Sequence, residues 1–160
     1  MIDLVGVNIT LNEILHMEFR NILVAFDSSG FANRAFKNAL EIAEPNSSKI
    51  TIATVVTGIY QPSIGFSMKY SKELLEKHSK LLKKVFSKLQ VQARKKSLNL
   101  TLKILYDPSV SKAILNYVNA KKFDLVVIGS HGRTGLNRII LGSIANEVTQ
   151  KANCPVMVVK

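Results

Sequence analysis

The sequence predicts an α/β domain with a doubly wound, Rossmann-like open sheet of five parallel strands and helices on both faces. Short runs of branched apolar residues alternate along the chain with longer segments whose apolar residues recur three and four positions apart. Such alternation is typical of buried strands joined by right-handed helical crossovers. At 160 residues the chain is also long enough for one domain with a sizeable core.

The first half of the chain predicts two strands and two helices. Residues 21–26 (NILVAF) and 50–56 are short apolar runs that indicate strands. Residues 31–43 place Phe36, Leu40 and four alanines on one helical face. Residues 57–67 contain two glycines and a proline and predict a loop. Residues 70–94 predict a long amphipathic helix whose apolar stripe comprises Leu74, His78, Leu81, Leu82, Val85, Phe86, Leu89 and Ala93.

The second half predicts three further strands and two helices. Strands are expected at residues 98–105, 124–128 and 155–159, and the last helix at 144–152. Asp107 and Pro108 predict the cap and first turn of a helix whose apolar face carries Val110, Ile114, Tyr117 and Val118. Residues 1–16 have no assigned role and form an N-terminal extension to a single domain at 17–160.

The net charge of +11 is concentrated in one segment, because residues 69–96 carry ten basic residues against two glutamates, a net +8. A solvated helix face is the common explanation of such a run. The segment has no aromatic stacking array and no nucleic-acid-binding motif, so specific nucleic-acid binding is not expected.

Location is indicated by the lack of targeting patterns. No apolar run approaches the roughly 18 residues that span a bilayer, and the N-terminus lacks the basic-then-apolar pattern of a signal peptide. The single cysteine, Cys154, excludes an internal disulfide and is expected to be a small buried residue. We expect a cytoplasmic protein with no membrane partner.

Two predicted strands end in polar or glycine-rich loops. Asp27-Ser28-Ser29-Gly30 follows the first strand, and Gly129-Ser130-His131-Gly132 follows the fourth. Ligands of open α/β sheets bind at the carboxyl ends of the strands. If these two strands are neighbours, both loops line one crevice.

The stretch from Gly129 to Ser143 has the composition of a phosphate site. Glycines such as Gly132 permit close backbone approach and unusual dihedrals, and Gly142-Ser143 begins the last helix, where unpaired N–H groups favour an anion. Ser143 is expected to be the N-cap or a hydroxyl donor, and Arg133 and Arg138 add positive charge. Neither GxGxxG nor GxxxxGK[ST] is present, so the residues alone leave a plain loop and an anion site equally open.

The full spacing, Gly129-x2-Gly132-x9-Gly142-Ser143, resembles the G-x2-G-x9-G-[ST] signature of the universal stress protein family. The strand-one aspartate, the wording GSHGRTG and the ending CPVMVVK extend the resemblance over residues 17–160. It implies the strand order 3-2-1-4-5 and binding of ATP, AMP or ADP. The implied contacts are Asp27 and Val55 to adenosine, Ile128 and Gly129 to adenine and ribose, and Gly132, Gly142, Ser143 and Ile144 to the phosphates. Ala25 departs from the proline that many nucleotide-binding members carry.

The resemblance also implies a homodimer through the last strand, residues 155–159, which as an apolar edge strand needs a cover. Mg²⁺ or Mn²⁺ is expected to be held mainly by phosphates and water. No residue is assignable as a catalytic base, and His131 is expected to stabilise the turn. The leading interpretation is therefore an ATP-binding, nucleotide-responsive stress protein that acts on an unidentified protein partner. The alternatives are a slow ATPase or nucleotide-cleaving enzyme, and a dimeric interaction module that does not bind nucleotide.

Overall fold

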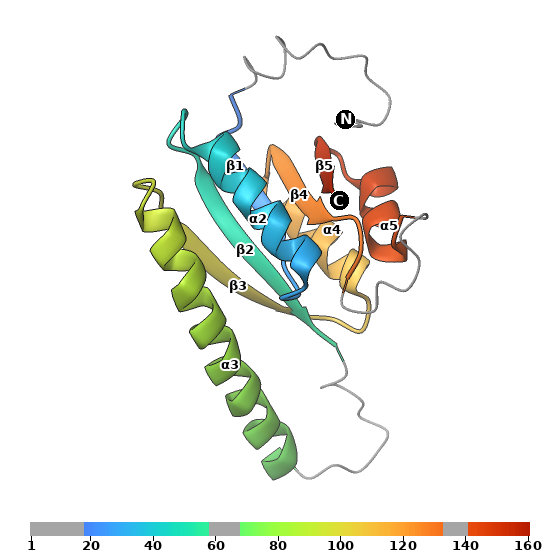
Figure 1. The fold of residues 1–160 in the computed structure, drawn as a ribbon. Coiled ribbons are helices and arrows are strands. Elements are labelled where there is room, and N and C mark those ends of the chain that lie inside the picture. The colour runs from blue at the N-terminus through green and yellow to red at the C-terminus, as the bar shows by residue number, and fades with distance from the viewer. Residues whose placement is uncertain (1–17, 58–67, 133–140) are drawn as a thin grey trace.

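The computed structural model describes residues 18–57, 68–132 and 141–160, with the side chains of residues 68–75, 78 and 79 left out. A parallel sheet of five strands forms its centre, in the order β3-β2-β1-β4-β5 (Figure 1). This order confirms the predicted doubly wound fold. The elements are β1 (Asn21–Ala25), α2 (Gly30–Ala43), β2 (Lys49–Val56), α3 (Met68–Arg94), β3 (Leu100–Tyr106), α4 (Val110–Lys121), β4 (Leu125–Gly129), α5 (Ser143–Lys151) and β5 (Val156–Val159).

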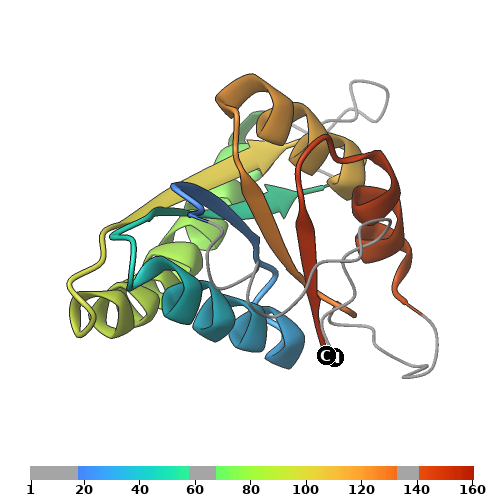
Figure 2. The ribbon, with the colours of Figure 1, turned by 90° about the horizontal axis from the view of Figure 1, so that it is seen from above.

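Helices cover both faces of the sheet (Figure 2). Successive side chains of a strand point to opposite faces, so Ile22 and Val24 pack with Phe36 of α2, whereas Leu23 and Ala25 pack with Ile114 of α4. The helices α2 and α3 contribute to the first core, and α4 and α5 to the second. The central strands β1 and β4 are therefore buried on both sides, as central parallel strands are.

The position of β1 brings the two polar loops together. β1 pairs with β2 on one side and with β4 on the other, and Ala25 is in register with both Ala53 and Ile128. At the amino ends of β1 and β4, Asp124 accepts a hydrogen bond from the backbone N–H of Arg20 at 2.7 Å. The carboxyl ends of β1 and β4 are thus neighbours, as the crevice argument requires.

Two predicted helix starts are wrong in detail. Ser109, not Asp107, is the N-cap of α4. Asp107 instead accepts a hydrogen bond from the N–H of Ser109 at 2.8 Å, because a short acidic side chain competes well for the N–H two residues on. α5 has Gly142 as its N-cap, so Ser143 is its first helical residue.

The predicted stripe of α3 is confirmed in part. Leu89 and Ala93 are buried and Val85 packs against the same core. The prediction that Leu81 belongs to the buried stripe is wrong, because this residue is 60% exposed. The side chains of Leu74 and His78 lie outside the described residues. No helix in the described part of the chain is long and apolar enough to cross a membrane.

Candidate functional site

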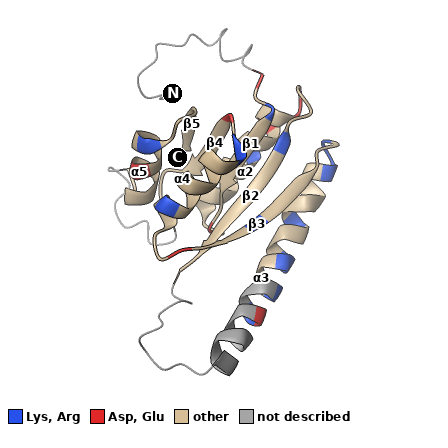
Figure 3. Cartoon of the chain, turned by 180° about the vertical axis from the view of Figure 1, so that it is seen from behind, with Lys and Arg blue, Asp and Glu red and all other residues tan. Residues whose placement is uncertain are grey.

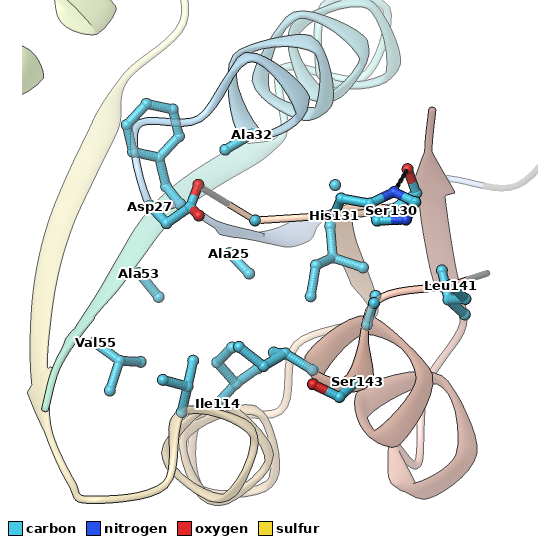
Figure 4. A pocket seen from close by; sticks show the side chains of 18 of the residues that line it. Ala25, Asp27, Ala32, Ala53, Val55, Ile114, Ser130, His131, Leu141 and Ser143 are labelled. Carbon is cyan, nitrogen blue, oxygen red and sulfur yellow. Dashed lines mark hydrogen bonds between the residues drawn. The ribbon is translucent and has the colours of Figure 1, made fainter. Parts of the chain in front are cut away.

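A cavity of about 530 Å³ opens at the carboxyl ends of β1, β2 and β4. Its walls come from these strand ends, from the beginning of α4 and from the beginning of α5 (Figure 4). The size suits a ligand of a few rings, because small-molecule sites measure roughly 300–1,000 Å³.

All but one of the residues predicted for the site line this cavity. They are Asp27, Val55, Ile128, Gly129, Gly132, Gly142, Ser143 and Ile144. Arg133, like Arg138 and most of the loop predicted at 57–67, lies outside the described residues. The chain thus brings together residues from both halves of its sequence, which only the β1–β4 pairing makes possible.

The loop after β1 is shaped by hydrogen bonds to its own backbone. Ser28 adopts a left-handed conformation with φ of 69°, and Asp27 accepts a hydrogen bond from the N–H of Ser29 at 2.9 Å. The hydroxyl of Ser29 then accepts from the N–H of Ala32 at 3.0 Å and caps α2. Ser29 is therefore the N-cap of α2, and the Asp27 carboxylate, held by the same loop, lines the cavity.

The glycines of the site serve close approach rather than unusual dihedrals, since none of Gly129, Gly132 and Gly142 has a left-handed φ. A Cβ on Gly129 would lie 2.7 Å from the Cβ of Phe31, and one on Gly132 would lie 2.9 Å from Asp27 Oδ2. A Cβ on Gly142 would lie 3.0 Å from the carbonyl oxygen of Ser130. The two loops and the start of α5 therefore approach one another closely around the cavity, with no room for a side chain at these three positions.

The first turn of α5 faces the cavity without a side-chain cap. Gly142 has no side chain to accept from the helix amides, whereas serines cap both α2 and α4. Ser143, Ile144 and Ala145 all line the cavity. The first amides of a helix have no partner within it, and together they favour an anion. This end of the cavity is therefore suited to a phosphate or carboxylate group.

Ser130 connects the site to the edge strand β5. Its N–H donates to the carbonyl of Val159 at 2.7 Å, and its own carbonyl accepts from the N–H of Gly142 at 2.9 Å. Its hydroxyl lies 3.1 Å from Nδ1 of His131, and the His131 ring lies 5.2 Å from the Phe31 ring, centroid to centroid. These contacts show His131 held at the rim of the cavity, and they agree with its expected role in stabilising the turn.

The apolar wall of the cavity is the part that sequence reasoning missed. Ala53 from β2, Val110 and Ile114 from α4, and Leu141 before α5 line it. The sequence pattern identified Val110 and Ile114 as core residues of a helix. Only the structure shows that they also line the cavity. The alternation of β2 does place Ala53 on the face of Val55, which was a usable indication.

A part-buried hydrogen bond joins α4 to α5. The Ser111 hydroxyl donates to Oε2 of Glu147 at 2.6 Å, and Lys151 Nζ lies 2.7 Å from Oε1. The hydrogen bond from Lys151, followed by that from Ser111, lowers the pKa of the Glu147 carboxyl. The two helices that supply the apolar wall and the open amides are thus tied to each other.

The chemistry of the cavity suits a ligand with three parts. The amides of α5 favour an anionic end, the Asp27 carboxylate accepts hydrogen bonds from hydroxyl or amino groups, and the wall between them is apolar. Within the described residues no three His, Cys, Asp or Glu side chains gather in a group that could hold a metal ion. Asp27 is the carboxylate among the lining residues.

The profile of the universal stress protein family matches residues 18–160. Universal stress protein MJ0531 of Methanocaldococcus jannaschii is 32% identical over 145 residues, which are 89% of this chain and 82% of that protein. The structure of universal stress protein UspA from Lactobacillus plantarum superimposes with a TM-score of 0.77 at 28% identity, over 90% of this chain and 99% of that one.

Two solved structures with the same fold contain an adenine nucleotide. The universal stress protein from Archaeoglobus fulgidus in complex with dAMP has a TM-score of 0.63 at 22% identity, covering 90% of this chain and all of the other. A family protein from Arabidopsis thaliana with AMP bound has a TM-score of 0.58 at 21% identity, covering 88% of this chain and 91% of the other. The match of the family profile over nearly the whole chain, with the sheet order and the cavity at its strand ends, shows that the chain belongs to the universal stress protein family.

Proposed function

We propose that the cavity binds ATP and that the chain is a nucleotide-responsive regulatory protein rather than an enzyme. The observation that carries this proposal is the uncapped first turn of α5 at the cavity, in a chain whose helices α2 and α4 both have serine caps. Family structures that contain dAMP and AMP support an adenine nucleotide as the ligand.

The proposed pose follows from the chemistry of the walls. The phosphates lie against the amides of Ser143 and Ile144, beside the backbone of Gly132 and Gly142, which also lines the cavity. The ribose hydroxyls or the adenine amino group donate to Asp27. The base lies against the apolar wall formed by Val55 and Ile114. Mg²⁺ or Mn²⁺ would be held mainly by phosphate oxygens and water.

The first experiment is chromatography of the nucleotide released when freshly purified protein is denatured, followed by calorimetric titration of MgATP and AMP. Gly142→Asp places a side chain and a negative charge at the start of α5, where the phosphates are proposed to bind, and should abolish binding. Ser143→Asp should also abolish binding while preserving folding, because an acidic residue suits the first turn of a helix.

Gly30→Asp is the matched control for these variants. It adds the same carboxylate to the first turn of α2, where the nearest atom to a new Cβ is Arg34 Nη1 at 3.7 Å, and it should bind like the wild type. Failure of the wild type to release or bind any adenine nucleotide would overturn the proposal. Conversion of bound ATP to ADP over hours would show an ATPase instead of a binding protein.

We further propose a homodimer that pairs two copies of β5. In the described sheet β5 is an edge strand, and Met157, Val158 and Val159 are only half-buried in the single chain. Analytical ultracentrifugation should find a dimer, and Val158→Lys should shift it toward monomer because a lysine on an edge strand disfavours pairing with another strand. A wild-type monomer at micromolar concentration would contradict this assembly.

A further inference from the structure

The exposed side of α3 has a charge pattern that the nucleotide site does not use. The residues Lys77, Leu81, Lys84, Lys88, Val91 and Lys95 follow one another at spacings of four and three positions. Residues at these spacings lie on one side of a helix. We call this row the lysine stripe; Lys95 is the residue that follows the end of α3, and the part within the helix, from Lys77 to Val91, is about 21 Å long at 1.5 Å per residue.

Every member of the lysine stripe is exposed. The two aliphatic members are exposed to an unusual degree, Leu81 at 60% and Val91 at 55%. Lys77 and Lys84 flank Leu81, and Lys88 and Lys95 flank Val91, each at helical spacing. Val85, Leu89 and Ala93 lie on the other side, in the core or packed against it, and Leu82 and Phe86 are half-buried.

Within the side chains that the structure describes, the stripe lysines form no ion pair. Among the described residues, the ion pairs are those of Arg20 with Glu18, of Lys96 with Glu41 and Glu44, and of Lys151 with Glu147. None of the four stripe lysines takes part. Figure 3 shows basic residues repeated along the described part of α3. Lysines four apart on a helix repel one another, and a polyanionic partner would remove this repulsion.

We propose that the lysine stripe is a docking surface for an anionic lipid bilayer. Lysines that alternate with exposed aliphatic side chains suit such a surface, because the ammonium groups reach the headgroups while leucine and valine enter the boundary of the acyl chains. A straight row also touches a flat surface along its whole length. Adsorption of this kind needs no membrane-spanning helix, and it would replace the expectation from the sequence that the protein has no membrane partner.

Other occupants fit the stripe less well. A second copy of α3 would bring lysines against lysines. A nucleic-acid duplex would use the charges but not Leu81 and Val91, and arginine, which binds phosphate in a bidentate manner, is absent from the stripe. The bilayer is the partner that uses all six residues.

The test measures partition of the full chain into vesicles in a flotation assay at low salt. Vesicles of 70% phosphatidylcholine and 30% phosphatidylglycerol should bind the protein, and pure phosphatidylcholine should not. The triple variant Lys77→Gln, Lys84→Gln, Lys88→Gln should bind about 100-fold more weakly, at roughly fivefold per lysine. Glutamine matches lysine in helix propensity, so unchanged circular dichroism is expected.

The matched control removes three exposed lysines elsewhere, in Lys37→Gln, Lys112→Gln, Lys121→Gln. It lowers the net charge of +11 by the same three units but should weaken binding by no more than about twofold, because these lysines do not share one surface. The variant Leu81→Gln, Val91→Thr should weaken vesicle binding about tenfold and leave the weak attraction to duplex DNA unchanged.

Three results would overturn the proposal. The first is equal binding to anionic and neutral vesicles. The second is equal weakening by the two lysine triples, which would show a response to net charge alone. The third is binding of duplex DNA that is tighter than binding of vesicles. If the triple lysine variant of the stripe weakened this DNA binding and the Leu81→Gln, Val91→Thr variant did not, the stripe would be a nucleic-acid surface.

Discussion

Replacing Gly129 with alanine tests whether the end of β4 truly packs against the start of α2. The new Cβ would lie 2.7 Å from Phe31 Cβ, 2.9 Å from the Phe31 carbonyl carbon and 3.1 Å from the Ala32 nitrogen. Carbon atoms in contact prefer about 3.5–4.0 Å. Two of the three atoms belong to the backbone, so rotation of a side chain cannot relieve the overlap. The strand end and the helix must move apart.

The magnitude follows from two opposing effects. Overpacking of a well-packed site costs about 1–3 kcal/mol, while alanine stabilises by about 0.4–1 kcal/mol through the unfolded chain. We therefore expect a net loss of about 1–2 kcal/mol in the free energy of unfolding. For a chain of this size that lowers Tm by roughly 2–8 °C.

Urea unfolding followed by circular dichroism measures this loss, with Gly30→Ala as the control. A Cβ on Gly30 meets Arg34 Nη1 at an ordinary 3.7 Å, so this variant should be as stable as the wild type or slightly more so. Equal stability of Gly129→Ala and Gly30→Ala would refute the argument from close approach, because the same methyl group is crowded by backbone atoms at Gly129 and has ordinary contact distances at Gly30.

Three further predictions concern single side chains. Ser29→Ala removes the cap of α2 and should cost about 1 kcal/mol in urea unfolding, and Ser28→Ala, whose side chain caps nothing, is its control; equal losses would contradict the capping role. The ionised Glu147 carboxyl has a pKa below its usual 4.5, so its contribution is complete above that value and disappears as the pH falls through the lowered pKa. The Tm advantage of the wild type over Glu147→Gln should therefore shrink between pH 6 and pH 3, and an advantage constant over that range would rule out the linkage. Burial, and next the charge of Asp124, raises the pKa of the Cys154 thiol; its rate of alkylation against pH should have a higher midpoint in the native protein than in urea, and coinciding midpoints would show an exposed thiol.

The strands and helices could be predicted from the sequence because burial on both faces leaves a clear pattern. The central strands β1, from Ile22 to Ala25, and β4, from Leu125 to Ile128, are apolar at every position, since neither side of a central strand meets water. Competition between local hydrogen bonds was harder to foresee. Asp107 and Ser109 both suit a helix cap. In the structure Asp107 accepts a hydrogen bond from the N–H of Ser109, and Ser109 caps α4.

The candidate site divides in the same way. Gly129, Gly132 and Gly142 could be found by their spacing, yet the reason for each glycine required the positions of Phe31, Asp27 and Ser130. Backbone contacts between distant segments leave no trace in local periodicity. The apolar wall from α4 was missed because a core residue and a cavity-lining residue have the same apolar pattern.

The β1–β4 pairing has a consequence for folding. Asp27 comes from the first strand of the sheet and Gly142 from the start of its last helix, so the cavity is complete only after the two halves of the chain have joined. Contacts of such high sequence separation form slowly, because the chain loses the entropy of loop closure before these contacts can stabilise it. A ligand that bridges them would bind the folded chain and neither half alone. Bound ligand would therefore raise the free energy of global unfolding and protect the central strands β1 and β4 together from hydrogen exchange.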